Sequence, residues 1–180
     1  MFPNLPQALN ITLTVIIAII ALWFLFLIVD LLFVLFFSTV LKKHAKAMTV
    51  ILNAKFENTK KLYDLFITYN IPVEAKLLET LNSINSADFN RQDTKEGTEA
   101  RTTLSYLRDE ANFISNRNKI LLEKADFVIA KNNVLELDTQ YRSNIAMYNA
   151  DVLGYNYWIT FLPCRFVFKI FKVKKKDIIA

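Results

Sequence analysis

The chain has 180 residues, a net charge of +5 and a hydrophobic fraction of 53%, and its one cysteine, Cys164, excludes a disulfide within the chain. Most of the excess positive charge lies at the C-terminal end, because residues 42–163 carry 16 basic and 15 acidic side chains while residues 164–180 carry six basic and one acidic. A nucleic-acid-binding domain carries its basic patch on the folded body. The charge distribution therefore argues against a nucleic-acid partner.

The first element is an apolar stretch over residues 11–41. A helix of about 20 apolar residues crosses a bilayer, so this stretch predicts a transmembrane helix. It is not a cleavable signal peptide, since residues 1–10 carry no basic group and the apolar run exceeds the usual core of about 7–15 residues. Lys42, Lys43 and Lys46 flank its C-terminal side, and the positive-inside rule places that side in the cytoplasm and the N-terminus outside.

The one charged residue in this stretch is Asp30. If the bilayer covers residues 18–38, Asp30 lies near the midplane, where an ionised carboxylate costs about 2.5–3.5 kcal/mol and would contact another transmembrane helix. If the span is instead residues 10–29, Asp30 lies at the interface and residues 31–41 pack against protein. Both interpretations stay open, because the apolar stretch is longer than one crossing requires.

Two helices and a loop are predicted next. Apolar side chains at steps of three and four predict a helix over residues 42–69 that continues from the apolar stretch without a glycine or proline. Asn70 is expected to cap the following helix and Pro72 to lie in its first turn, which gives a short helix over residues 72–85. The segment 86–97 is polar and predicts a loop.

Two longer helices follow, over residues 94–131 and 134–162. Their apolar positions recur with a period near 3.5, which is typical of supercoiled helix packing. The pattern predicts an all-α fold, an antiparallel bundle of about four helices, although some of these positions could instead form an intermolecular coiled coil. Asn118 falls among the apolar positions of the third helix, where it either fixes the register or faces solvent.

The last predicted helix carries a motif in which a Tyr-Asn pair recurs after seven residues. The motif residues are Tyr148, Asn149, Val152, Tyr155, Asn156, Ile159 and Pro163. This pattern resembles the C-terminal signature of the LemA family. Residues 60–65 (KKLYDL) are similar to the basic pair, Tyr-Asp and Leu of that family's first bundle helix.

The resemblance implies a short outward N-terminus, one membrane helix and a cytoplasmic all-α bundle. It implies little chemistry, because the family is mostly without an assigned activity and is linked to envelope functions and membrane proteases. The chain departs from the family at Ile145, where an arginine is usual, and it lacks the acidic Tyr-Pro element before the last helix.

The motif also has a physical interpretation of its own. Its tyrosines and aliphatic residues share one face of a helix, and Asn149 and Asn156 lie one position further round. Such side chains form either a packed, hydrogen-bonded core edge or a site for a ligand or partner.

The chain offers little for catalysis or metal binding. His44 is the only histidine and Cys164 lies far along the chain, so the usual set of zinc ligands is not present. No phosphate-binding glycine loop and no nucleophile–base motif occurs. We therefore expect no enzyme activity, no metal and no cofactor.

Residues 161–176 (FLPCRFVFKIFKVKKK) interleave aromatic and basic side chains, as segments at a membrane interface do. We expect residues 164–176 to lie on the cytoplasmic leaflet and to contact anionic lipids. The alternative is that the phenylalanines pack on the bundle. The candidate lipid-contact residues are Arg165, Lys169, Lys172, Lys174, Lys175 and Lys176.

These expectations divide the chain into a short N-terminus with a transmembrane signal anchor (1–41), a cytoplasmic helical bundle (42–163) and a basic-aromatic tail (164–180). The predicted function is a non-enzymatic, single-pass scaffold or adaptor in the cell membrane, acting as a homo-oligomer or with a membrane-protein partner. The alternative is an oligomeric assembly that shapes or permeates the membrane. That alternative rests on Asp30, an acidic residue within an apolar stretch that is longer than one membrane crossing requires.

Overall fold

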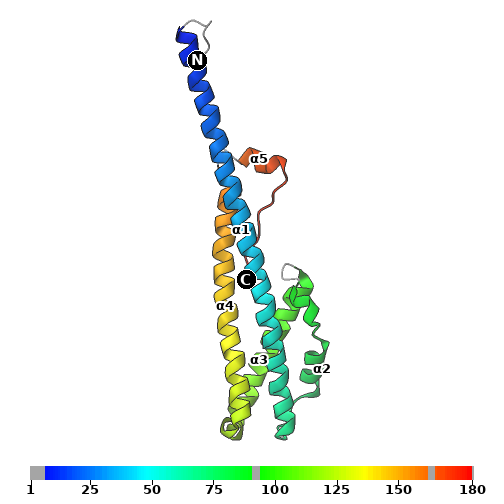
Figure 1. The fold of residues 1–180 in the computed structure, drawn as a ribbon. Helices are drawn as coiled ribbons and strands as arrows, with labels where there is room; N and C mark the ends of the chain where they lie inside the picture. Colours follow the sequence, from blue (N-terminus) through cyan, green and yellow to red (C-terminus); the bar gives the residue numbers. More distant parts are fainter. Residues whose placement is uncertain (1–6, 91–93, 162–164, 180) are drawn as a thin grey trace. The chain divides into compact units, whose positions relative to one another are not determined.

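The computed structural model describes residues 7–90, 94–161 and 165–179, and these residues form helices, turns and connecting segments without a strand. The predicted all-α class is therefore confirmed. The elements are α1 (Gln7–Thr68), α2 (Ala75–Ser83), the 3-10 helix η1 (Ser86–Asn90), α3 (Lys95–Arg117), the 3-10 helix η2 (Lys119–Glu123), α4 (Ala125–Thr160) and α5 (Arg165–Ile170) (Figure 1).

The chain forms two compact units. We call residues 1–42 with 148–180 the apolar unit, and residues 43–147 the core unit. α1 and α4 each contribute to both units. The last turns of α4 thus belong with the apolar helix and not with the rest of the predicted 42–163 body.

α1 runs from the apolar stretch into the core unit as one helix, as predicted, because no glycine or proline interrupts it. It ends in a Schellman motif, in which Ile71 N–H donates to Phe66 O at 2.8 Å and Asn70 N–H donates to Ile67 O at 3.0 Å. Asn70 takes the left-handed conformation that this motif requires, with φ of 54°. The prediction that Asn70 caps the next helix is therefore wrong, since its conformation ends α1 instead.

The prediction of one helix over residues 94–131 is also wrong. α3 ends at Arg117, and α4 begins at Ala125. Asn118 terminates α3, because its side-chain amide donates to Ile114 O at 2.8 Å and its backbone N–H donates to Ser115 O. The residue thus fixes no register inside a helix. Leu121 in η2 is buried. The spacing of apolar residues therefore continues through the break between α3 and α4, and the sequence pattern does not reveal that break.

The predicted polar loop 86–97 contains two ordered features. η1 buries the Phe89 ring completely. The loop then ends at Thr94, whose hydroxyl accepts a hydrogen bond from Gly97 N–H at 3.2 Å and caps α3. A single buried aromatic side chain therefore ties this polar segment to the bundle.

The hydrophobic interior of the core unit lies among α1, α2, α3 and α4. Tyr63 and Phe66 of α1 are fully buried there, and the Tyr63 hydroxyl donates to the backbone oxygen of Leu107 at 2.9 Å. Leu107 and Ala111 of α3 face this interior, while Leu104 packs in a second buried cluster with Leu52, Phe89 and Ala100. The buried residues of its main cluster are Leu62, Tyr63, Phe66, Leu77, Leu81, Leu107, Ala111, Leu121, Phe127, Ala130 and Val134.

A network of charged side chains crosses the core unit. Asp138 of α4 accepts from Lys55 Nζ at 2.5 Å, from Arg108 Nη1 at 2.5 Å and from Arg142 Nε at 3.0 Å. Lys55 is only 2% exposed, so its ammonium group depends on this carboxylate for its counter-charge. The network joins α1, α3 and α4 through one acidic residue.

The pKa values reflect this arrangement. Burial lowers the pKa of Lys55, and the hydrogen bond and charge of Asp138 offset this only in part. Burial alone would raise the pKa of Asp138. The hydrogen bond from Lys55 and the charges of Lys55, Arg108 and Arg142 outweigh that effect and hold the pKa of Asp138 below its usual value. Asp138 is consequently ionised at neutral pH.

We predict that Asp138→Ala lowers the free energy of unfolding by about 3–5 kcal/mol, because it leaves the buried Lys55 ammonium without a counter-charge. Denaturant unfolding of the full chain in detergent micelles, followed by circular dichroism, measures this loss.

The matched control is Arg142→Ala, which removes another member of the same network. The Arg142 side chain is 73% exposed, so the expected loss is only about 0–1 kcal/mol. Equal losses for the two variants would contradict the assignment of Asp138 as the centre of the network.

Candidate membrane-contact site

The apolar half of α1 has almost no protein cover. Nearly all its large side chains from Leu9 to Val29 are exposed, and α1 is the one helix in the described part of the chain that is long and apolar enough to cross a membrane. An uncovered apolar surface of this size is not stable in water. The geometry therefore agrees with the predicted span at the level of length and composition.

From residue 31 onward, one side of α1 packs against the last turns of α4. The Phe33 ring stacks on the Trp158 ring with 4.3 Å between centroids and 2° between planes. Gly154 allows this close approach, because a Cβ atom there would lie 2.7 Å from Cζ of Phe37. Val152 and Ile159 of α4 are also buried.

Asp30 lies at the point where this packing begins. It is 2% exposed within a single chain, and its Oδ2 atom has no hydrogen-bond partner among the described residues. Val34 and Leu41 are buried below it, while Leu32 and Leu35 stay exposed. Residues 31–41 thus pack against protein on one side only.

Asn149 and Asn156 hold the C-terminal segment of the chain. Asn149 Nδ2 donates to Ile179 O at 2.8 Å, and Ile179 N–H donates to Asn149 Oδ1 at 2.9 Å. Asn156 makes the same pair of bonds with Lys176, at 2.8 and 2.9 Å. Each amide therefore satisfies both backbone groups of one tail residue, as a neighbouring strand would. We call this arrangement the asparagine clamp.

The seven-residue spacing of the motif follows from this geometry. Seven residues of α-helix rise about 10.5 Å, and three residues of extended chain, from Lys176 to Ile179, cover about 10 Å. The order is antiparallel, since the earlier asparagine binds the later tail residue. Two asparagines at this spacing on one helix can thus bind one extended segment at two points.

The tyrosines of the motif line the same region. Tyr148 and Tyr155 are each 6% exposed, and the Lys176 ammonium lies 5.6 Å from the centre of the Tyr155 ring, within the range of a cation–π contact. The motif is thus a packed and hydrogen-bonded edge whose partner is the chain's own tail. Pro163, the last motif residue, lies outside the described residues.

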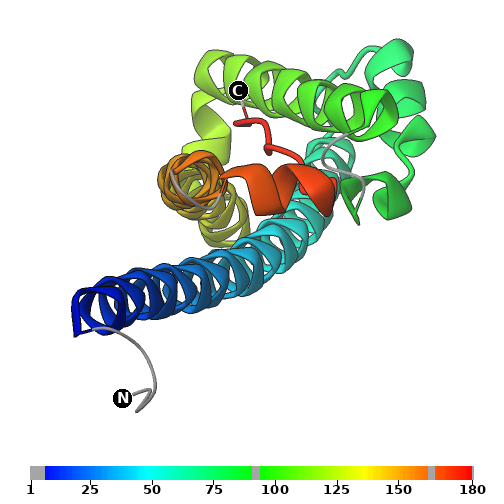
Figure 2. The same ribbon diagram turned by 90° about the horizontal axis from the view of Figure 1, so that it is seen from above.

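α5 lies crosswise to α1 (Figures 1 and 2). Phe168 is buried, and an apolar cleft separates the two helices. The cleft is lined by Phe24, Leu27, Ile28, Leu31, Val167, Phe168 and Phe171. α5 ends in a second Schellman motif, in which Val173 N–H donates to Phe168 O and Lys172 has φ of 54°.

The other side of α5 combines exposed apolar and basic side chains. Phe166, Ile170 and Phe171 are each at least two-thirds exposed. The predicted lipid-contact residues surround them. Arg165, Lys169, Lys172, Lys174 and Lys175 are exposed, and Lys176 is half-buried by the asparagine clamp. This combination is typical of helices that lie in a membrane interface.

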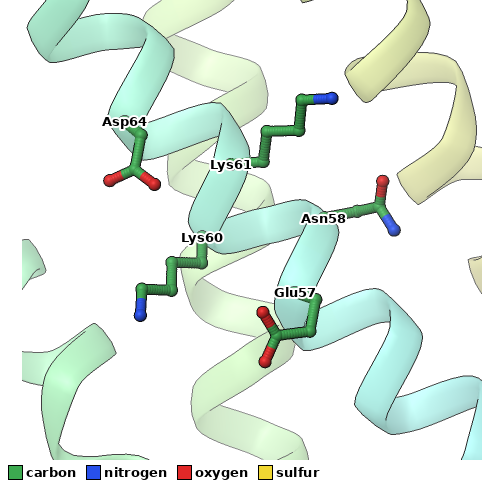
Figure 3. A pocket seen from close by; sticks show the side chains of 5 residues that line it. All are labelled: Glu57, Asn58, Lys60, Lys61 and Asp64. Atoms are coloured by element: carbon green, nitrogen blue, oxygen red, sulfur yellow. The ribbon is translucent and has the colours of Figure 1, made fainter.

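The KKLYDL segment divides between core and surface. Leu62 and Tyr63 are buried, whereas Lys60, Lys61 and Asp64 line a shallow polar hollow on α1 together with Glu57 and Asn58. The five side chains of this hollow spread in different directions and do not converge on one point (Figure 3). Within the described residues, no group of three or more histidine, cysteine or carboxylate side chains is placed to hold a metal ion.

Sequence reasoning missed the partner of the asparagines, the Phe33–Trp158 stack and the charged network around Asp138. A signal for the network was present, because Lys55 follows Leu52 by three residues and precedes Thr59 by four, both of which lie on the buried side of α1. Comparison with family models, with curated proteins and with solved structures finds no match to this chain.

We predict that Asn156→Ala makes the Lys176 amide exchange its hydrogen roughly tenfold faster, and that Asn149→Ala does the same for Ile179, because each variant removes two hydrogen bonds to one residue. Amide exchange of the full chain in detergent micelles, resolved by residue, gives both rates.

Asn144→Ala serves as the control, since the Asn144 amide donates only to Gln140 O in its own helix. This variant is expected to leave tail exchange unchanged. Unaltered exchange at Lys176 and Ile179 in the two clamp variants would show that the tail is held in some other way.

Proposed function

We propose that the chain is a single-pass, membrane-anchored helical scaffold or adaptor of the LemA-like kind, without enzyme activity. The observation that carries the proposal is the uncovered apolar surface of α1 from Leu9 to Val29, which needs a lipid environment. The basic residues that follow it favour a cytoplasmic core unit and an outward N-terminus in the cell membrane.

The scaffold role rests on the surface of the core unit. Its helices present alternating acidic and basic side chains, and the hollow in Figure 3 is of this kind. Such a surface suits reversible contact with a protein partner or a second copy. The membrane-permeating alternative loses its main motive, because Asp30 is already buried by its own chain and does not require another transmembrane helix to cover it.

Reporter fusions at the two ends of the full chain test the orientation. We expect the N-terminal reporter outside and the C-terminal reporter in the cytoplasm. Changing Lys42, Lys43 and Lys46 to Gln should weaken or invert this preference, because these charges set it.

The same number of lysines changed elsewhere provides the control. Lys76, Lys95 and Lys119 are exposed in the core unit, and their replacement by Gln should leave the orientation intact. An exported C-terminal reporter in the unaltered chain would overturn the proposed topology.

The lipid contact of α5 has its own test. We expect the amides of Arg165–Ile170 to exchange roughly tenfold more slowly in nanodiscs of anionic lipid than of neutral lipid, since each basic residue near an anionic surface contributes about 1 kcal/mol. Replacing Arg165, Lys169, Lys174 and Lys175 by Gln should remove the difference, and high salt should reduce it.

A control variant with Gln at Lys60, Lys61, Lys76 and Lys119 has the same charge but keeps the tail. It should retain the dependence on lipid charge. If the unaltered chain exchanges equally in both kinds of nanodisc, α5 packs on protein alone and makes no electrostatic contact with lipid.

A further inference from the structure

The outward side of α4 changes character along the helix. In the core unit its exposed positions are mainly polar, as at Glu136, Gln140 and Ser143. In the apolar unit Leu153 and Tyr157 of α4 are 66% and 57% exposed, and Phe161, which directly follows the helix, is 37% exposed. Next to these exposed residues, Trp158 and Gly154 contact Phe33 and Phe37 of α1. The exposed side of the last turns of α4 is thus largely apolar, while Asn149 and Asn156 on another side bind the tail.

The end of α4 and the residues that follow it form an uncharged stretch that stops at Arg165. From residue 152 to residue 164 the sequence has no Asp, Glu, His, Lys or Arg, and Arg165 then begins the basic tail. The helical part of this stretch, residues 152–160, covers about 14 Å, which is too short to cross a hydrocarbon core of about 30 Å. An uncharged segment of this length is typical of an element that enters one leaflet and does not cross.

We propose that the last turns of α4 lie in the interfacial region of the cytoplasmic leaflet, beside α1, and that α5 continues in the plane of the same interface. This inference rests on the proposed function, because it needs α1 as the anchor. It assigns lipid as the occupant of the exposed surface formed by Leu153, Tyr157 and Phe161.

The contacts between α4 and α1 indicate how deep the end of α4 lies in the membrane. Trp158 stacks on Phe33 and Gly154 faces Phe37, so α4 accompanies the cytoplasmic third of the apolar stretch. That stretch is about 46 Å long as a helix, which exceeds the hydrocarbon core by about 16 Å. The excess is accounted for if residues 31–41 and the end of α4 share the interface, where tryptophan and tyrosine are favoured.

The backbone of the returning tail supports the same placement. In a water-poor interface an extended segment needs protein partners for its N–H and C=O groups. The asparagine clamp supplies both partners for Lys176 and for Ile179. A second copy of the chain is a poorer occupant than lipid, because the chain continues into α5, where Arg165 and Lys169 adjoin the exposed Phe166 and Ile170 in the pattern of an interfacial helix.

Tryptophan fluorescence in vesicles tests the inference, since Trp23 and Trp158 are the only tryptophans. The reporter variant carries Trp23→Phe, Trp158→Phe and Tyr157→Trp. The matched control carries the same two phenylalanines and Tyr106→Trp, at a position of α3 that is 50% exposed. A third variant, Trp158→Phe alone, leaves Trp23 to report on the anchor.

Each full-length variant is reconstituted in vesicles of phosphatidylcholine and phosphatidylglycerol. The lipids are unlabelled, brominated near the glycerol backbone or brominated near the chain end, and iodide is the aqueous quencher. We expect the Tyr157→Trp reporter to lose roughly half its fluorescence to the shallow brominated lipid and to resist iodide. The Tyr106→Trp control should show the reverse, and Trp23 should respond most to the deep brominated lipid.

The outcomes separate the two proposals. A Tyr157→Trp reporter that iodide quenches like the control, with Trp23 still quenched by deep lipid, overturns the inference and leaves the anchor standing. Protection from both quenchers assigns the surface to protein and also overturns it, as does quenching of the Tyr106→Trp control by brominated lipid. If Trp23 does not respond to lipid, the proposed anchor itself is wrong.

Discussion

Apolar surface that must stay out of water is the constraint on which the apolar unit depends. α1 presents far more of it than protein contacts cover, and what cover exists is concentrated beyond Asp30, where α4 packs through Trp158 and the gap left by Gly154. Burial of apolar side chains contributes about 25 cal/mol per Å² removed from water, so the contact between the two helices is favourable wherever it shields these side chains from water. Phe168 of α5 then faces α1 across the apolar cleft, and the asparagine clamp holds the tail on α4.

The two units handle buried charge in different ways. In the core unit Lys55 is buried, but Asp138 neutralises it and draws in two arginines, so removal of one partner is far more costly than the pair itself is stabilising. In the apolar unit Asp30 is buried with one oxygen lacking a hydrogen bond in the described structure. An unsatisfied buried polar group costs about 1–3 kcal/mol. Its place, where protein cover of α1 begins, fits the interpretation that puts residues 10–29 in the bilayer.

Much of the fold followed from the apolar pattern, because period and charge determine helices and their buried sides directly. Apolar residues that recur at steps of three and four are buried at Met48, Leu52, Tyr63 and Phe66 of α1 and at Tyr148, Val152 and Tyr155 of α4, whereas the burial of Lys55 was not predicted. The errors came from single asparagines. Asn70 ends α1 through its backbone conformation, and Asn118 ends α3 through a local side-chain hydrogen bond. Neither effect changes the spacing of the apolar residues, so the apolar pattern could not reveal it. The tail contacts were out of reach for another reason, since pairing across 20 and 30 residues depends on where the chain turns after α4.

The motif that suggested a LemA resemblance consists of residues with structural roles in this chain. Its tyrosines and aliphatic residues pack α4 against its neighbours, and Asn149 and Asn156 bind the backbone of the tail. Binding through backbone groups constrains the two asparagines and the length of the segment between Lys176 and Ile179, but leaves most tail side chains free to vary. The tail can therefore carry basic and aromatic residues for a lipid surface while the clamp holds its course. In this chain the motif thus has a structural role, because its two asparagines hold the returning tail against the last turns of α4.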